Sequence, residues 1–364
     1  MLLDDLLEEG QRQLNVCNSC RYCAAYCAVW PALEKHTVLS EENVVDLANL
    51  CHDCRDCYDA CMYTAPHEFD LNPPALFAAV REQTYESYAW PSSRPSWLRG
   101  PWSIAAAFVA FCVLLGFLGY LTTDALLPSE TGGSAYDVIG HWTLVAVVMV
   151  PSLWAVLAFF MSSRKYWLTI HGRFAGLLNP KAWLSTLKQA ATLKHQTGGG
   201  TGCTYPSEIP SNSRRRWHHS VSYGFLLTLV ATMAAAFGEY FLGSESPYPY
   251  LSVPVITGTL GGIMMTVGCT ALLVLKRQSA DDLTTPGMKR ADVAFIWALL
   301  ILSVTGLLVL VLRDTVAFAP VLVVHLGAVL VAFSLAPYTK FMHWIYRVLS
   351  IHSDNLKLQA GAAK

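Results

Sequence analysis

The chain has 364 residues, which is long enough for two domains. Hydrophobic residues make up 54% of it and charged residues only 14%, so the composition is too apolar for an ordinary water-soluble protein. The formal net charge is −1. We expect an all-α protein with a helical head and a membrane stem, and no nucleic-acid partner.

The first segment, 1–83, contains eight of the eleven cysteines in two runs of identical C-x2-C-x2-C-x3-C spacing. The runs are Cys17, Cys20, Cys23 and Cys27, followed by Cys51, Cys54, Cys57 and Cys61. This is the spacing of bacterial ferredoxins that hold two [4Fe–4S] clusters, in which the fourth cysteine of each run ligates the other cluster. The proline that usually follows each run is missing, since Ala28 and Met62 stand there.

The crossover of the fourth cysteine gives a definite assignment of ligands. Cluster one is expected on Cys17, Cys20, Cys23 and Cys61, and cluster two on Cys51, Cys54, Cys57 and Cys27. A disulfide framework is the first alternative, but disulfides need an oxidising compartment and no secretory signal opens the chain. Zinc is the second, but structural zinc prefers paired knuckles to cysteines at every third position. Helical spacing of leucines, and Ser40 as a cap for a helix over 41–50, predict a helical ferredoxin-like domain.

Residues 84–101 are rich in proline and tryptophan and predict an interfacial linker. Trp90, Trp97 and Trp102 are suited to the lipid headgroup layer, and the prolines end the head.

The segment 102–347 contains six apolar stretches with at most one charged residue each, and each is about the ~20 residues that a bilayer span requires. They cover roughly 102–122, 140–161, 218–241, 254–275, 292–312 and 317–340. Within 163–217, basic residues interrupt a further apolar stretch and predict an amphipathic cytoplasmic segment. Residues 348–364 are expected to form a cytoplasmic tail.

Basic residues indicate the orientation of the spans, because Lys and Arg accumulate in cytoplasmic loops. With a cytoplasmic N-terminus, the outer loops 123–139, 242–253 and 313–316 contain one basic residue, Arg313. The inner loops contain Arg164, Lys165, Arg214, Arg215, Arg216, Lys276, Arg277, Lys289, Arg290, Lys340 and Arg347. We expect a multi-pass protein of the cytoplasmic (inner) membrane with both termini cytoplasmic.

Histidines at membrane depth are candidate haem ligands. His325 and His343 are 18 residues apart, which on one continuous helix places them on the same face about 27 Å apart. That spacing suits two b haems, although Pro337 between them could bend the helix. His218 and His219 match the depth of His343, with His219 preferred, and His141 is the candidate partner of His325. One or two b haems are therefore expected.

The remaining histidines and cysteines carry weaker signals. His171 is either a competing ligand or a surface residue, and the others, His36, His52, His67, His195 and His352, are expected at the surface. Cys112 and Cys269 lie in spans as small apolar residues. Cys203 follows a glycine run that lacks the Gly-Lys-Ser/Thr ending of a P-loop, and we expect it to be an unreactive cytoplasmic thiol.

Together these motifs resemble the tricarballylate/citrate utilisation protein B family over nearly the whole chain. The resemblance rests on the two cysteine runs, the Trp/Pro junction, Arg215-Arg216-Trp217-His218-His219 and Lys340-Phe341-x-His343-x-x-Tyr346-Arg347. It implies a partner flavoprotein, an FAD-dependent tricarballylate dehydrogenase, whose electrons pass through iron–sulfur clusters and haem to the membrane quinone pool.

No G-x-G-x-x-G motif follows a strand, and no acid–base set suits a carboxylic acid, so substrate chemistry belongs to another polypeptide. The chain is then an electron-transfer oxidoreductase subunit without an organic-substrate site of its own. A tricarboxylate transporter and a membrane-anchored iron–sulfur redox sensor without haem are the alternatives. A transporter has no need of two clusters, and the spans lack the paired breaks of inverted repeats.

Overall fold

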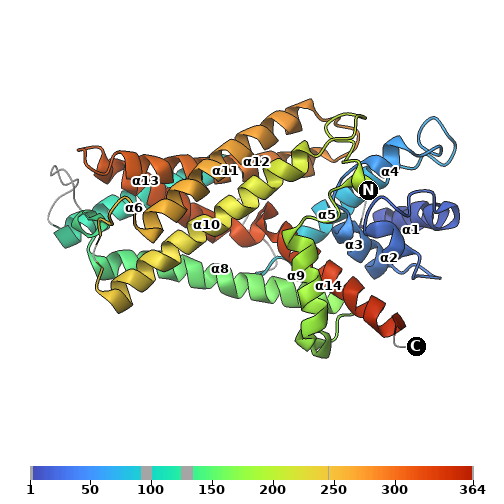
Figure 1. The fold of residues 1–364 in the computed structure, drawn as a ribbon, viewed down its shortest axis with the longest axis horizontal. Coiled ribbons are helices and arrows are strands. Elements are labelled where there is room, and N and C mark those ends of the chain that lie inside the picture. The colour runs from blue at the N-terminus through green and yellow to red at the C-terminus, as the bar shows by residue number, and fades with distance from the viewer. Residues whose placement is uncertain (1–2, 92–100, 124–133, 245, 363–364) are drawn as a thin grey trace.

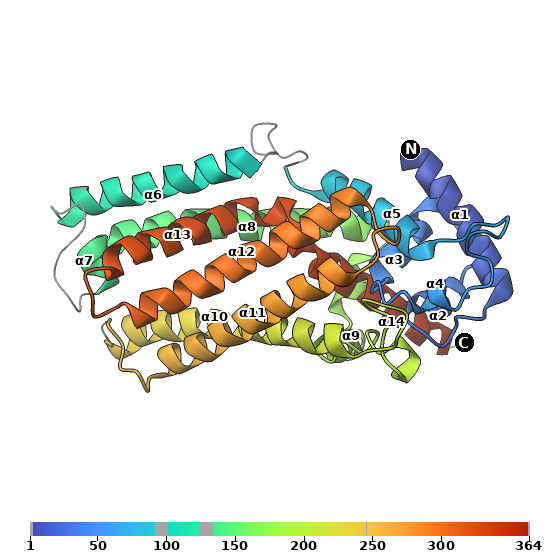
Figure 2. The same ribbon diagram turned by 90° about the horizontal axis from the view of Figure 1, so that it is seen from above.

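The structure is a computed structural model that describes residues 3–91, 101–123, 134–244 and 246–362. Within these ranges it contains helices and no strand, apart from one isolated β-bridge between Cys203 and Ser211. The molecule is elongated: long helices run along its length, and a smaller helical head lies at one end (Figures 1 and 2). The predicted all-α fold class is confirmed.

The head consists of five helices and their connecting turns. They are α1 (Leu3–Cys20), α2 (Val29–Leu33), α3 (Glu41–Leu50), α4 (Asp56–Asp59) and α5 (Pro73–Tyr88). The predicted cap of α3 is present as a reciprocal pair, because the Ser40 side chain accepts from the Asn43 N–H and the Asn43 side chain accepts from the Ser40 N–H. The two cysteine runs flank α2 and α3, so these helices set the distance between the runs.

Six helices among the described residues are long and apolar enough to cross a membrane. They are α6 (Pro101–Thr123), α8 (His141–Thr169), α10 (Ser213–Leu242), α11 (Val253–Gln278), α12 (Pro286–Val311) and α13 (Phe318–Leu335). A short helix, α7 (Ala135–Val138), precedes α8. The predicted six-span stem is confirmed. Trp97 lies outside the described residues, whereas the Trp90 ring lies 5.6 Å from that of Trp154 on α8.

The segment between α8 and α10 contains η2 (Phe174–Leu178), α9 (Pro180–Ala191) and η3 (Gly198–Gly200). Helix α9 is amphipathic as predicted: Ala182 and Thr186 are buried, while Leu184 and Leu187 are exposed. Its long apolar side chains are therefore available to a membrane surface beside the head.

The last span ends earlier than predicted. Helix α13 stops at Leu335 and is followed by two short turns, η4 (Ala336–Tyr338) and η5 (Lys340–Met342), and then by a separate helix, α14 (His343–Ala362). Pro337 lies in the first of these turns, and Thr339 between them is extended (φ −112°, ψ 176°). His325 lies on α13 and His343 on α14, so the distance between these two histidines that was predicted from one continuous helix was wrong.

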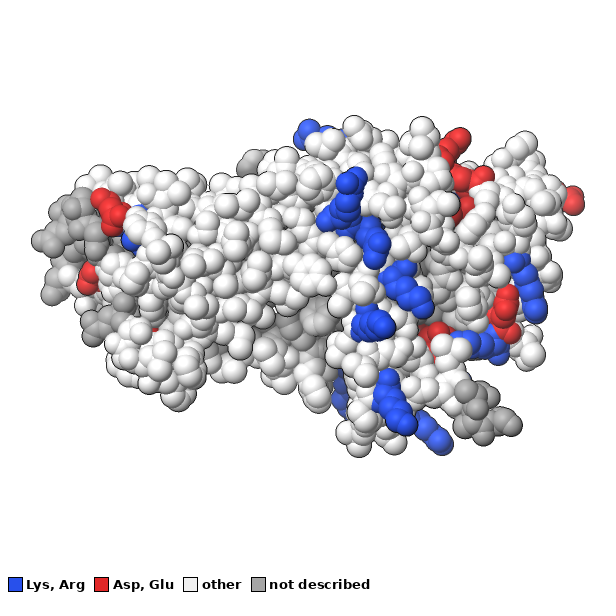
Figure 3. All heavy atoms as spheres, viewed as in Figure 1, with Lys and Arg blue, Asp and Glu red and all other residues white. Residues whose placement is uncertain are grey.

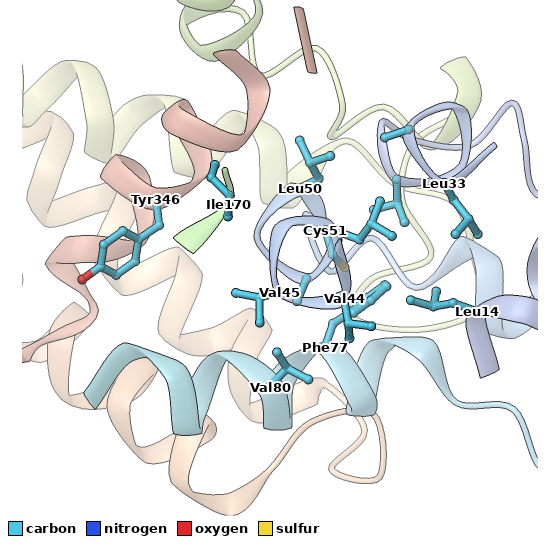
Figure 4. Packing of buried hydrophobic residues seen from close by; sticks show 14 of the residues in the cluster. Leu14, Leu33, Val44, Val45, Leu50, Cys51, Phe77, Val80, Ile170 and Tyr346 are labelled. Carbon is cyan, nitrogen blue, oxygen red and sulfur yellow. The ribbon is translucent and has the colours of Figure 1, made fainter. Parts of the chain in front are cut away.

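The main hydrophobic core joins the head to the stem. Val44, Phe77 and Leu14 of the head pack in one cluster with Ile170 at the end of α8 and Tyr346 of α14 (Figure 4). Residues 348–362 of the expected C-terminal tail belong to α14, which packs against α3 and α9.

Charge is distributed unevenly along the molecule. Figure 3 shows Lys and Arg side chains gathered in a band where the stem meets the head, and a stem surface almost free of charge on this face. The N-terminal end of α1 and the C-terminal end of α14 both lie at the head end (Figure 1).

Candidate metal centres

All eight head cysteines are free thiols, and they form two groups that cross between the runs. Burial and the neighbouring Cys61, Cys23 and Cys20 raise the pKa of Cys17 to about 12. Cys61 of the second run thus lies with the first three cysteines of the first run.

Cys27 shows the reciprocal arrangement. Its thiol donates to the Cys54 sulfur, and this bond, burial and the nearby Cys51 and Cys57 hold the Cys27 pKa well above its ordinary value. The fourth cysteine of each run thus has cysteines of the other run as neighbours, as the ferredoxin crossover expects, and Cys57 lines the same pocket as Cys17, Cys20, Cys23 and Cys61.

Backbone N–H groups point at sulfur in both groups. The Asp53 N–H donates to Cys51 Sγ at 3.3 Å, and the Tyr63 N–H donates to Cys61 Sγ at 3.3 Å. Asp53 adopts a left-handed backbone (φ +55°) in the turn after Cys51. Such bonds stabilise negative charge on sulfur and tune the potential of a bound cluster.

Two arginines from different parts of the chain converge on the Cys51 peptide carbonyl. Arg347 of α14 donates to it at 2.7 Å, and Arg81 of α5 donates to it at 3.2 Å. Arg347 also donates to the Asn49 carbonyl at 3.2 Å. The start of α14 is thereby fixed directly to the second cysteine group.

A second pair of arginines flanks the turn between Cys51 and Cys54. Arg55 and Arg214 lie over the Tyr205 ring, 4.7 and 4.6 Å from its centroid. Each also approaches an Asp53 carboxylate oxygen, at 3.8 and 3.7 Å. Four guanidinium groups therefore surround this group of cysteines. The first group is more open, since Cys20 is exposed and a pocket there is lined by Cys17, Cys20, Cys23, Cys57 and Cys61.

Cys203 is a ninth cysteine at this site, which sequence reasoning missed. It is buried beside Cys54, and their sulfurs and one Asp56 carboxylate oxygen all lie within 4.8 Å of one another. The sequence indicated an unreactive cytoplasmic thiol and did not predict this position beside the head cysteines. Its only sequence signal is the adjoining glycine run, which has no fixed spacing from the head cysteines.

His218 and His343 face each other where α10 enters the stem and α14 begins. Their ring centroids are 6.2 Å apart and their planes are at 84°. His343 Nδ1 is bonded to the Lys340 carbonyl at 2.5 Å, and His218 Nδ1 to Ser222 Oγ at 3.2 Å. Burial, the positive charges of Arg347 and Lys340, and the neighbouring His218 hold the pKa of His343 well below its ordinary value. His343 is therefore neutral, the form in which imidazole binds metal.

Aromatic side chains line the same region. The Phe295 ring lies 6.1 Å from that of His343, and the Phe341 ring lies 5.7 Å from Phe225 and 6.1 Å from Phe295. These rings from α10, α12 and η5 make an apolar surround for the two imidazoles.

His219, the residue preferred from the sequence, does not face His343, whereas His218 does. His219 Nε2 is bonded to the Ala191 carbonyl at 3.1 Å, away from His343. His171 is exposed, and its Nε2 lies 3.9 Å from Glu42. The expected surface positions of His52 and His352 were also wrong, because both are buried.

The other proposed pair, His141 and His325, is not brought together. His141 Nδ1 lies 3.0 Å from Glu239, its Nε2 lies 3.3 Å from the Tyr240 hydroxyl, and its ring packs on Tyr136. His325 Nδ1 is bonded to Thr305 Oγ1 on α12 at 2.9 Å. The two ligands predicted for an outer haem thus engage different neighbours.

These features define a multi-pass membrane protein with a ferredoxin-like helical head. A family model described as citrate utilization protein B matches residues 99–364, and one described as the Fer4-like domain of that protein matches residues 10–87. The chain is 36% identical over 349 residues to a citrate utilization protein B of Escherichia coli, covering 94% of this chain and 90% of that one. The chain belongs to the citrate utilization protein B family, which confirms the resemblance. No solved structure matches it.

Proposed function

We propose that this protein is a membrane electron-transfer subunit in the use of citrate or tricarballylate. It reoxidises the FADH2 of a partner flavoprotein resembling tricarballylate dehydrogenase and reduces membrane quinone. The observation that carries the proposal is the pairing of two crossed groups of four cysteines with a facing pair of histidines at the junction of head and stem.

The cysteines fit two [4Fe–4S] clusters by their chemistry and grouping. Cys17, Cys20, Cys23 and Cys61 would hold cluster one, and Cys51, Cys54, Cys57 and Cys27 would hold cluster two. The grouping of their sulfurs and the N–H donors to Cys51 and Cys61 support this assignment. When bound, the clusters and a b haem would supply one-electron carriers between the flavin and the quinone.

His218 and His343 would together hold one b haem. With a metal–nitrogen bond of about 2 Å on each ring, the centroids of two imidazoles bound to one metal ion lie roughly 6 Å apart. The 6.2 Å separation of these rings agrees with that value. The hydrogen bonds at each Nδ1 leave Nε2 as the ligating atom and fix the ring orientations.

A second haem, expected on His325 and His141, has weaker support. Both ring nitrogens of His141 already have hydrogen-bonding neighbours. The proposal therefore contains one haem, at the head end of the stem.

The surroundings of the two cysteine groups support an order of electron transfer. The first group lies at an open pocket, and the exposed side chains of Tyr22 and Met62 beside it offer a surface for the flavoprotein. The second group is connected to His343 through Arg347, one helical turn further along α14, which donates to the Cys51 carbonyl. We infer entry at cluster one and exit from cluster two toward His343.

The distribution of basic residues supports an inner-membrane location with the head in the cytoplasm. Arg164 and Lys165 of α8, Arg277 of α11 and Arg290 of α12 all lie in the parts of the spans next to the head. At the opposite end of the spans, Arg313 is paired with Asp314. Positive charge at the head end agrees with a cytoplasmic head.

The proposal is tested by purifying the full chain in detergent and measuring iron, acid-labile sulfide and the visible spectrum before and after reduction. We expect roughly eight cluster irons and one b haem per chain. His218→Ala and His343→Ala should each abolish the haem bands, while His219→Ala, the matched control, should retain them. A protein without haem but with both clusters would favour the redox sensor, and a protein without either would favour the transporter.

A further inference from the structure

The loop between α9 and α10 belongs to the stem in sequence but lies against the second cysteine group. Gly198, Gly199, Gly200 and Gly202 all have positive φ, between +51° and +119°. A Cβ on Gly198 would lie 2.5 Å from Asp56 Oδ2, and one on Gly202 would lie 2.7 Å from the Ser211 backbone. The glycines therefore permit both the backbone path and the close approach of this loop to the head.

Hydrogen bonds fix this loop to both cysteine runs. The Gly199 N–H donates to the carbonyl of Tyr26, the residue before Cys27, at 3.2 Å. The Thr204 N–H and hydroxyl both donate to Asp56 Oδ1, at 2.7 and 3.0 Å. Cys203 lies between these two anchors, so the position of its side chain is tightly determined.

The Cys203 side chain is buried next to two groups that can accept a hydrogen bond, the Cys54 sulfur and the Asp56 carboxylate. It is 2% exposed, and its sulfur lies within 4.8 Å of the Cys54 sulfur and of an Asp56 carboxylate oxygen. Asp56 is 6% exposed, and its Oδ2 has no hydrogen-bond partner among the described residues. When Cys54 is a cluster ligand its sulfur carries no proton, so a hydrogen bond between the two neighbouring sulfurs can only be donated by Cys203.

We propose that Cys203 is a positioning residue of cluster two, whose S–H donates a hydrogen bond to the Cys54 sulfur and raises the reduction potential of that cluster. This inference rests on the proposed iron–sulfur function. A donor aimed at a ligating sulfur stabilises the more negative, reduced cluster, and this is one of the factors that set cluster potentials. The glycine loop also covers Cys27 and Cys54, so the stem completes the environment of a cluster whose ligands all come from the head.

The consequence is a difference between the two clusters. Cluster two has the Cys203 thiol and four nearby arginines, whereas cluster one lies at an open pocket. The thiol donor and the positive charges of the arginines both favour the reduced state of cluster two, so electrons that enter at cluster one are drawn toward His343.

The test measures the midpoint potential of each cluster in the full chain by EPR-monitored redox titration. In Cys203→Ala, the ratio of oxidised to reduced cluster two at a given potential should rise at least threefold. For a one-electron couple this corresponds to a midpoint potential lower by about 28 mV. Cys203→Ser keeps a hydroxyl donor and should shift it less. Cluster one should not move in either variant. Cys269→Ala, which removes another buried thiol within α11, is the matched control and should move neither cluster.

Several results would overturn the inference. If Cys203→Ala and Cys269→Ala give the same cluster-two potential, the hydrogen bond does not tune the cluster. If Cys203→Ala and Cys203→Ser both lose about four irons, Cys203 is a ligand and not a donor. A parent protein without a second cluster would overturn the proposed function itself, and this inference with it.

Discussion

Asp292→Asn is the substitution with the clearest expected effect on stability. The Asp292 carboxylate on α12 lies between two lysines, 2.6 Å from Lys276 Nζ on α11 and 2.9 Å from Lys340 Nζ on η5. All three side chains are largely buried. This triad connects two spans to the turn that precedes His343.

The expected magnitude follows from the geometry. At an effective dielectric constant of about 20, each of these ion pairs attracts by roughly 6 kcal/mol, and desolvation offsets much of that energy. Removing the charge of Asp292 leaves Lys276 and Lys340 buried without their counter-ion, so each lysine must either keep an unpaired charge or lose its proton. We expect the free energy of unfolding to fall by about 3–5 kcal/mol, the usual cost of breaking a buried pair.

The assay is SDS-induced unfolding of the full chain in mixed micelles, followed by tryptophan fluorescence. Asp281→Asn is the control, because the pair formed by Asp281 and Lys289 is exposed, and it should cost less than about 1 kcal/mol. Replacing the whole triad by Asp292→Leu, Lys276→Met and Lys340→Met should recover most of the loss, since no buried charge then remains unpaired. The reasoning is refuted if Asp292→Asn costs under about 1 kcal/mol, or if the triple variant is no more stable than Asp292→Asn.

Three further predictions concern the head and its junction with the stem. Cys61→Ser should lose the cluster assigned to the first cysteine run, roughly four irons, and survival of both EPR signals would contradict the crossover. Burial lowers the pKa of Lys340 to about 8; the unfolded chain, with a higher pKa, binds more protons above that value. The free energy of unfolding should therefore increase by about 3 kcal/mol between pH 8 and pH 10.5, and Lys340 should add no pH dependence below pH 8. An equal increase in the Lys340→Gln variant would contradict this. A fragment of residues 1–91 should precipitate with fewer than eight irons, because Ile170, Tyr346 and Cys203 are missing; a soluble fragment with a full complement would show that the head folds alone.

Features that depend on local spacing were predictable from the sequence. The cysteine runs have a fixed period, the Ser40 cap depends on neighbouring residues, and the spans are continuous apolar stretches. The helix over 41–50 and the six-span stem were therefore predicted correctly.

Features that depend on rotation about a helix or on distant contacts were not predictable. Whether His218 or His219 faces His343 depends on a rotation of about 100° between adjacent residues, which hydropathy does not report. The break at Pro337 and Thr339 falls where the apolar stretch ends, so composition did not distinguish a bent helix from two separate ones. Cys203 meets Cys54 only after α9 and the glycine loop fold back on the head.

The shared core of Figure 4 has a consequence for the biosynthesis of the protein. Arg347, which donates a hydrogen bond to the Cys51 carbonyl, is synthesised 296 residues after Cys51. At translation rates of about 5–20 residues per second, that interval lasts roughly 15–60 s. During this time the ribosome has released the head cysteines, but the helix that closes their core has not yet been made. During this interval the head cysteines are accessible to iron–sulfur assembly proteins on the nascent chain. Synthesis of α14 then completes the hydrophobic core around them.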